Sequence, residues 1–434
     1  MPNRFEQYLT LAGEQIRWKR ARPRLLSELR THLLDERDGY LARGMTEEAA
    51  QAEAIRQMGD PVLVGQSLDA VHRPKPQWGL LTLSLLLAAT GVVLRIWLTA
   101  GWANGGSAPV WSITALCLGV AALLGAYLLD VSWLGRHGKG IFLGVLCLGL
   151  LFFALHRAFW SGSFSYPVAG MQCLMMCVPL AFGLCLYSCR GQGWKGVCLP
   201  LLGLAAVSLL SVACHQLLVA PFVWLVGLVL LWVLAGQDWF SLGKRTTRAV
   251  ALGVLLALLA AGFLALQNDY IATRLSVALH PGQDPMGAGY TGLVLQQALE
   301  GAQWIGEGEY NLPVVQGADT YFLTTILQKL GWLPVLAIVL AMGGALTWML
   351  VRGLRQRNSL GKITVLSVTV SLLFRLVLGL SSLGFPLWGA GIPLFFTSTG
   401  AAVDLALLGF ALSALRQEQL PTADPAPLRI PETE

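Results

Sequence analysis

The chain has 434 residues, of which 55% are hydrophobic and only 12% are charged. An ordinary soluble domain carries about 25% charged residues, and a mean hydropathy of +0.62 implies more apolar surface than one water-soluble core can bury. Composition therefore excludes a soluble enzyme, a disordered chain and a secreted disulfide scaffold. The formal net charge of +6 lies mainly in short stretches between apolar runs, which indicates a multi-pass protein of the lipid bilayer and no nucleic-acid partner.

Residues 1–76 predict a small cytoplasmic helical domain. We expect one helix from about Pro23 to Arg43, a second capped by Thr46, and a third that Asp60 caps and Pro61 begins. From Leu29 onward the sequence resembles the permease-prefix (HAAS-like) module found ahead of various membrane proteins. The resemblance implies a docking or regulatory role without chemistry of its own.

The remainder predicts an all-α transmembrane domain, residues 77–417, with about ten membrane spans of roughly 20 residues each. Basic residues fall on alternate connections, which predicts that both ends of the chain are cytoplasmic. After residue 417 the Pro-, Ala- and acid-rich stretch 418–434 predicts a disordered cytoplasmic tail. The expected spans lie near 79–99, 109–129, 140–159, 167–189, 197–213, 216–236, 249–267, 320–350, 363–384 and 392–415.

Residues 268–319 form one long polar connection, expected on the outer face of the membrane. A loop of this length on a compact bundle is usually functional or disordered, and its glycines and apolar residues argue against disorder. Asp284-Pro285, Gly287 and Gly289 form a turn cluster, and Tyr290 opens an amphipathic stretch that contains Gln296.

Three strings in the second half of the chain resemble the SEDS family (FtsW, RodA, SpoVE), the polytopic glycosyltransferases of peptidoglycan synthesis. The family's DP-x-G-x-GYQ string corresponds to Asp284–Tyr290, with Thr291 in place of the glutamine. Its LP and T-D-F segments correspond to LPVVQGADTYF, residues 312–322, in which the acid is one residue out of register. Its GIPLPF-x-SYGG string corresponds to Gly391–Ala401, which retains Pro393, Ser398 and Gly400.

The resemblance implies that the catalytic carboxylate is Asp319, which would take a proton from the attacking sugar hydroxyl. A cap at the start of the next helix is the structural alternative for Asp319. By the same resemblance, the turn, the loop helix and the third string would bind substrate: Asp284, Gly287, Gly289, Tyr290, Gln296, Pro393, Ser398 and Gly400.

Three charged residues are further candidates for substrate binding. Arg274 can hydrogen-bond a pyrophosphate, or anchor the loop at the headgroup boundary. Arg375 and Asp404 lie inside predicted spans, where an unpaired charge is costly, so they are expected to pair and to line a cavity for the substrate headgroup. A purely structural ion pair is the equal alternative. No cofactor is certain, although the loop acids Glu300, Glu307 and Glu309 leave a divalent cation possible.

The resemblance as a whole implies a peptidoglycan glycosyltransferase that polymerises lipid II at the outer face of the bacterial plasma membrane, with a class B penicillin-binding protein as its partner. It would serve cell division, elongation or sporulation. Two alternatives stay open: a non-catalytic scaffold or regulator of the same fold, and a transporter of lipid-linked precursors. The sequence departs from the family's Q-P-S-E segment, where Gly170-Met171-Gln172 retains only the glutamine, and this favours the scaffold.

Overall fold

The computed structural model describes residues 4–19, 21–74, 76–99, 108–158, 166–214, 219–236, 238–309, 321–356, 358–381, 383 and 400–417. Throughout these residues the regular structure is helical, and they contain no strand. The chain divides into two compact units, one built on residues 1–76 and the other on residues 77–415. We describe each unit by itself.

The first unit is a bundle of four helices in its described part, with a core of its own. Phe5, Tyr8 and Ala12 on the first helix pack against Leu29 and Leu33 on the second. The first helix precedes the three helices that the sequence predicted for this domain. The helices are α1 (Arg4–Gln15), α2 (Arg22–Leu41), α3 (Glu47–Met58) and α4 (Pro61–His72).

Helix starts in the first unit follow the predicted capping pattern with one exception. The Asp60 side chain accepts a hydrogen bond from the Val62 amide at 2.8 Å, and Pro61 stands in the first turn of α4, so this prediction is confirmed. Thr46 occupies the cap position of α3, but its side chain makes no capping hydrogen bond. Our prediction that Thr46 caps this helix was therefore wrong in its chemistry, although the helix boundary is right.

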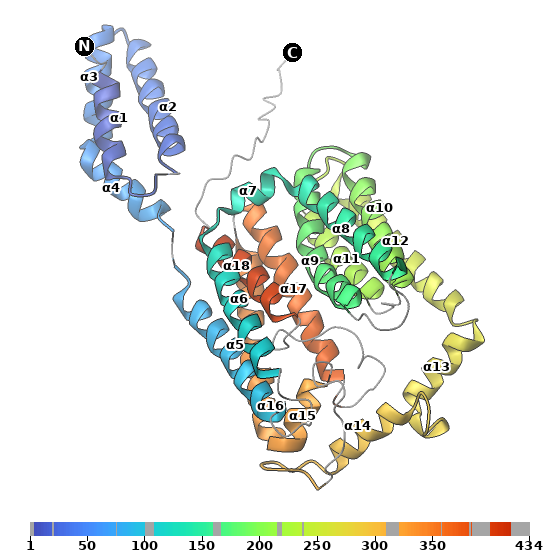
Figure 1. The fold of residues 1–434 in the computed structure, drawn as a ribbon. Coiled ribbons are helices and arrows are strands. Elements are labelled where there is room, and N and C mark those ends of the chain that lie inside the picture. Colours follow the sequence, from blue (N-terminus) through green and yellow to red (C-terminus); the bar gives the residue numbers. More distant parts are fainter. Residues whose placement is uncertain are drawn as a thin grey trace. The chain divides into compact units, whose positions relative to one another are not determined.

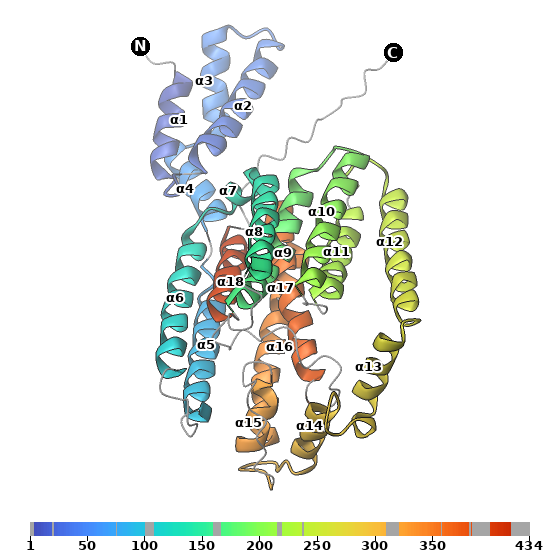
Figure 2. The ribbon, with the colours of Figure 1, turned by 45° about the vertical axis from the view of Figure 1, so that its right-hand side comes forward.

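The second unit holds the long apolar helices. Helix α9 lies at its centre and packs against α8, α10, α11 and α17, and α16 packs against α17 (Figure 1). Helix α12 packs on α11 and lies at the edge of the bundle (Figure 2). The long helices are α5 (Trp78–Thr99), α6 (Ala108–Leu128), α8 (Gly138–Ala158), α9 (Tyr166–Ser188), α10 (Trp194–Ala213), α11 (Val219–Ala235), α12 (Lys244–Ala265), α16 (Trp332–Arg355), α17 (Ser359–Ser381) and α18 (Ala401–Arg416).

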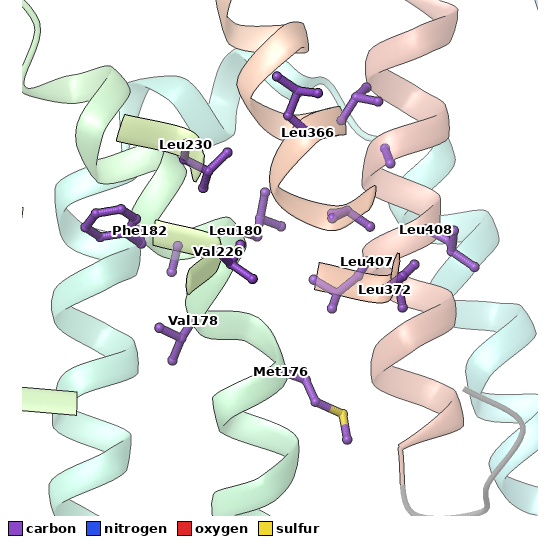
Figure 3. Packing of buried hydrophobic residues seen from close by; sticks show 14 of the residues in the cluster. Met176, Val178, Leu180, Phe182, Val226, Leu230, Leu366, Leu372, Leu407 and Leu408 are labelled. Carbon is purple, nitrogen blue, oxygen red and sulfur yellow. The ribbon is translucent and has the colours of Figure 1, made fainter. Parts of the chain in front are cut away.

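Branched and aromatic side chains fill the centre of this bundle. Figure 3 shows Phe182 of α9, Val226 of α11 and Leu372 of α17 among the residues that form this core. Phe182 is fully buried, as is Val226. Because the helices present apolar side chains to lipid as well as to each other, packing at this centre depends on shape rather than on a contrast of polarity.

The helix lengths support a polytopic membrane protein. Among the described residues, six helices are long and apolar enough to cross a membrane, and three shorter apolar helices accompany them. With α18, these match the ten predicted spans in order. The predicted fold class, an all-α membrane protein with about ten spans, is thereby confirmed.

Two predicted spans differ from the helices in the structure. The expected span 320–350 is two helices, α15 (Phe322–Leu330) and α16, because Gly331 between them has a φ of +90° that no continuous helix allows. The expected span 392–415 is described only from Gly400 onward, where α18 begins at Ala401. The break at Gly331 makes α15 part of the long connection rather than of a span.

Three further elements lie between α12 and α15. They are α13 (Asp269–Leu279), the short 3₁₀ helix η1 (Pro281–Gln283) and α14 (Tyr290–Glu300). Since α17 returns antiparallel to α16 after a short connection, the end of α17 lies at the same end of the bundle as α15 and the start of α16 (Figure 1). The loop elements and the last turns of α17 thus share one end of the second unit.

Helix α8 approaches α9 closely at Gly138, and this contact generates a stability prediction. A Cβ atom on Gly138 would lie 2.7 Å from the Leu184 carbonyl carbon, whereas a Cβ on Gly140 would meet nothing within 4 Å. Alanine favours a helix over glycine by up to about 1 kcal/mol. We therefore expect Gly138→Ala to lower the thermal midpoint of the detergent-solubilised protein and Gly140→Ala to leave it unchanged or raise it. Equal midpoints would contradict the close packing of α8 on α9.

Candidate functional site

The turn that follows α13 is organised around Asp284. Its carboxylate Oδ2 accepts a hydrogen bond from the Ala288 amide at 2.8 Å, and its main-chain carbonyl accepts one from the Gly289 amide at 3.0 Å. The Asp284 side chain is partly buried. One residue therefore closes the turn through both its side chain and its backbone, which fixes where α14 starts.

The turn requires glycine at positions 287 and 289, because the chain passes very close to Asp284 at both positions. A Cβ on Gly287 would lie 2.7 Å from Asp284 Oδ1, and a Cβ on Gly289 would lie 2.7 Å from the Asp284 carbonyl oxygen. These distances are shorter than side chains tolerate. The structure shows that Asp284, Gly287 and Gly289 build the turn. That these three residues bind substrate stays a prediction.

Tyr290 and Gln296 belong to α14, and Arg274 belongs to α13. Tyr290 is the first residue of α14, as predicted, and is half exposed. Gln296 is partly buried on the same helix. Arg274 is exposed, and its guanidinium lies 5.4 Å from the centre of the Tyr270 ring, a cation–π arrangement. These three side chains are carried by the loop and not by the membrane helices.

The segment after α14 is held to the end of α15 by backbone hydrogen bonds. The Gly306 amide donates to the Leu330 carbonyl at 3.0 Å, and the Gly308 amide donates to the Gln328 carbonyl at 2.8 Å. In the opposite direction, the Trp332 amide donates to the Gln303 carbonyl at 3.0 Å. We call this set of bonds, between residues 301–309 and 328–333, the loop clasp.

Glycines make the loop clasp possible. Gly331 and Gly306 have φ values of +90° and +99°, a conformation that other residues rarely adopt. A Cβ on Gly331 would lie 2.7 Å from the Gln303 carbonyl oxygen, and one on Gly308 would lie 2.9 Å from the Gly301 carbonyl oxygen. No local pattern predicts that these glycines join the loop to α15 and α16, because the residues they contact across the loop clasp are distant in the sequence.

The loop acids have different surroundings. Glu307 forms an ion pair with Lys329 across the loop clasp, and Glu300 is exposed at the end of α14. Within the residues that the structure describes, no three His, Cys, Asp or Glu side chains gather to hold a metal ion. Asp319, the predicted catalytic residue, lies outside the described residues, as do Pro393 and Ser398.

Arg375 of α17 and Asp404 of α18 form a buried ion pair. The two side chains are 1% and 0% exposed. Arg375 Nη2 donates to Asp404 Oδ2 at 2.8 Å, and Nη1 donates to Oδ1, so the contact is bidentate. The structure therefore brings together the two charges that were expected to pair.

The first turn of α18, which carries Asp404, lies close to α9. The Gly400 carbonyl accepts a hydrogen bond from the Asp404 amide at 2.9 Å, and a Cβ on Gly400 would lie 3.0 Å from Met176 Cε. Gly400, expected to bind substrate, thus joins the first turn of α18 to α9.

The ion pair belongs to the half of the bundle that carries the loop clasp. At 1.5 Å per residue, Arg375 lies about 9 Å along α17 before its end at Ser381. Asp404 lies in the first turn of α18. A buried pair of charges and a clasped loop are therefore present toward one end of the same bundle.

Polar residues on α17 that sequence analysis did not select extend away from the ion pair. Thr364, Ser367 and Ser371 are buried and precede Arg375 at spacings of three and four, which places all four on one helix face. Thr364 and Ser367 donate to carbonyls one turn earlier in the helix. The signal in the sequence was this helical spacing of hydroxyl groups inside an apolar run.

The turn gives a prediction with an internal control. Gly289→Ala should disorder the turn, because the added Cβ would meet the Asp284 carbonyl, at a cost of about 1–3 kcal/mol. Gly282→Ala should be neutral, since nothing lies within 4 Å of its added Cβ. Limited proteolysis of the folded protein measures the effect: cleavage between α13 and α14 should be faster only in the Gly289 variant. Equal cleavage of both variants would contradict the turn geometry.

The buried ion pair gives a second prediction. Arg375→Met or Asp404→Leu alone leaves one buried charge without its partner, which typically costs about 3–5 kcal/mol. The double variant removes both charges and should recover most of the lost free energy of unfolding. Equilibrium unfolding in mixed detergent micelles measures the four members of this cycle. Additive losses in the double variant would show that the two charges are not energetically coupled.

Comparisons with known proteins agree with the fold. No family model matches the chain. A protein of Alteromonas naphthalenivorans described as "Probable peptidoglycan glycosyltransferase FtsW" is 34% identical over 124 residues, which are 27% of this chain and 23% of that protein. The chain thus matches about a quarter of this relative's length.

Two solved structures share the fold over most of the chain. One is a chain of a peptidoglycan synthase complex, described for the structural coordination of polymerization and crosslinking. It has a TM-score of 0.59 and 21% identity, and the match covers 79% of this chain and 98% of that one. The other is an aspartate-to-alanine mutant of the rod shape determining protein RodA from Thermus thermophilus, with a TM-score of 0.52, 17% identity, and coverage of 79% and 97%.

Proposed function

We propose that this chain, a divergent SEDS-type protein by its fold and its shared segment, polymerises lipid II at the outer face of the bacterial plasma membrane. In this proposal a carboxylate of the long connection, Asp319, acts as the general base. The sugar hydroxyl attacks the anomeric carbon of the next unit, and the lipid pyrophosphate leaves. Sugars therefore accumulate on one growing chain while the lipid carrier stays in the bilayer.

The loop clasp is the observation that carries this proposal. It holds the last turn of α15 through Gln328 and Leu330, and within the clasped loop the Glu309 amide donates to the Gly301 carbonyl at 3.0 Å. Asp319 lies in the sequence between Glu309 and Tyr321, the residue before α15. Asp319 thus lies in a short segment of the chain between the clasped loop and α15, whose last turn the clasp holds.

Cationic groups would complete the chemistry. A pyrophosphate leaving group carries developing negative charge, which a fixed cation stabilises. Arg274 is exposed on α13 and is one candidate. Arg375 is the other, provided that its bond to Asp404 opens toward the substrate, since the buried pair now satisfies both charges.

A cross-linking partner is the next part of the proposal. The solved complex that resembles this chain coordinates polymerization with crosslinking. By the resemblance to SEDS proteins, this chain would bind a class B penicillin-binding protein, so that new glycan strands are joined to the wall as they form. Division, elongation and sporulation are the processes in which this pairing would serve.

One other function has specific support. The middle-span string at Gly170-Met171-Gln172 lacks the proline, serine and acid of the family's segment, and a separate helical unit precedes the membrane helices. Both features favour a scaffold that keeps the fold without the reaction. A transporter of lipid-linked precursors remains the third candidate, with no observation that favours it.

Purified protein incubated with labelled lipid II tests the proposal. Wild type should produce glycan chains, visible on a gel, and Asp319→Asn should lower the polymerisation rate by about 10²–10⁴-fold because the base is lost. Asp269→Asn is the matched control, since Asp269 is an exposed acid in the first turn of α13 in the same connection. It should retain the wild-type rate.

Each result assigns one function. Undiminished polymerisation by the Asp319 variant would refute the base. Leaflet exchange of lipid II without polymer would indicate the transporter, and neither activity would leave the scaffold. The Arg375→Met, Asp404→Leu double variant separates two roles of the buried pair: recovered stability with lost polymerisation indicates a substrate ligand, whereas recovery of both indicates a structural pair.

A further inference from the structure

The connection between α1 and α2 is the most basic stretch of the chain. Residues 17–24 read RWKRARPR, five basic residues in eight with no acid among them. The nearest acids in sequence are Glu14 before the stretch and Glu28 after it. We call residues 17–24 the basic turn. Such a concentration of charge has no role in the polymerisation chemistry proposed above.

Hydrogen bonds fix the basic turn to the rest of the first unit. The Arg17 amide donates to Asp69 Oδ1 of α4 at 2.9 Å, and Asp69 is buried. Arg22 Nη2 donates to the Ile16 carbonyl at 2.8 Å, which closes the turn on itself. In Figure 2 the end of α1 meets α4 at one end of the unit. The turn is therefore a fixed surface beside the last turns of α4.

Ion pairs neutralise only part of the positive charge of this unit. Elsewhere, arginines form ion pairs with neighbouring acids, as in Arg30 with Glu6 and Arg56 with Glu53. Arg24, at the end of the turn, pairs with Glu28. Arg17 and Lys19 are exposed and have no ion-pair partner among the described residues. Their charges are thus available to an external anion.

Trp18 stands between these two cations. It is partly exposed and packs against a small apolar cluster of Ile16, Ala21 and Leu25. A partly exposed indole flanked by lysine and arginine is typical of protein surfaces that contact the headgroup region of a bilayer. The side-chain chemistry of the turn therefore matches an anionic membrane surface.

Chain connectivity keeps the basic turn close to the bilayer. Only eight residues lie between Asp69, which binds the turn, and Trp78, where the first candidate membrane span begins. Even fully extended, this link reaches about 30 Å. This link contains two more basic residues, Arg73 and Lys75, and no acid. A surface tethered so closely meets headgroups at a high effective concentration.

We propose that the basic turn is a docking surface for anionic lipid headgroups, which bind Arg17 and Lys19 and hold the first unit against the membrane. Each basic residue near an anionic surface adds to the attraction, which falls off within a Debye length and is weakened by salt. Glu14, Glu28 and Asp69 are the acids nearest the turn; Asp69 is buried and accepts a bond from the backbone, and Glu28 is paired with Arg24.

The test uses the full chain in lipid nanodiscs. A donor dye is attached to a peptide tag at the amino terminus, and an acceptor dye is carried by the lipids. Energy transfer should be higher in discs of phosphatidylcholine mixed with phosphatidylglycerol than in discs of phosphatidylcholine alone, and added salt should remove the difference. Arg17→Glu with Lys19→Glu should lower the ratio of docked to undocked protein by about tenfold or more.

Arg43→Glu with Arg56→Glu is the control, because both residues are exposed, lie outside the basic turn and change the charge by the same amount. It should keep the lipid-dependent difference. A milder variant, Arg17→Gln with Lys19→Gln, should show a smaller loss and guards against misfolding from reversed charge. If energy transfer does not depend on phosphatidylglycerol, or if control and turn variants lose it equally, the proposal is wrong.

Discussion

Inside an apolar bundle no water satisfies polar groups, and this one constraint shapes the whole second unit. Backbone amides meet the constraint by forming helices. The Arg375 and Asp404 side chains meet it by pairing with each other, two hydrogen bonds between α17 and α18 that no solvent reaches. Such a pair contributes little net stability, since desolvation offsets the attraction, but it fixes which faces of the two helices meet.

The same demand for satisfied backbone groups explains the long connection. Where the chain leaves helical geometry, between α14 and α16, its amides and carbonyls bond across the loop clasp instead of to water. Gly331 permits the turn of the chain there, and Asp284 closes the turn before α14. The result is a structured connection whose elements are held to the start of α16.

The first unit is stabilised in a different way from the second, because its surface is polar. Its apolar side chains form a conventional core, around Leu29 and Leu33, and several of its arginines form ion pairs with acids nearby. The basic turn departs from that balance. In our proposal the two units therefore relate to the bilayer by different means: one through apolar helices that cross it, the other through charge that remains at its surface.

Composition and apolar run length alone determined the class of this protein and the order of its ten long helices, because a membrane span requires about 20 apolar residues wherever it occurs. The turn at Asp284 and the start of α14 at Tyr290 were also predictable, since glycine and aspartate spacing is local chemistry. Only the tertiary structure split the 320–350 run into α15 and α16, because the reason is a distant contact: the Gln303 carbonyl meets Gly331. The pairing of Arg375 with Asp404 was expected from the cost of an unpaired charge in a span, but its bidentate geometry depends on how α17 and α18 pack. Likewise, only the fold shows that Arg17 and Lys19 have no ion-pair partner among the described residues, because pairing depends on which side chains come together in space.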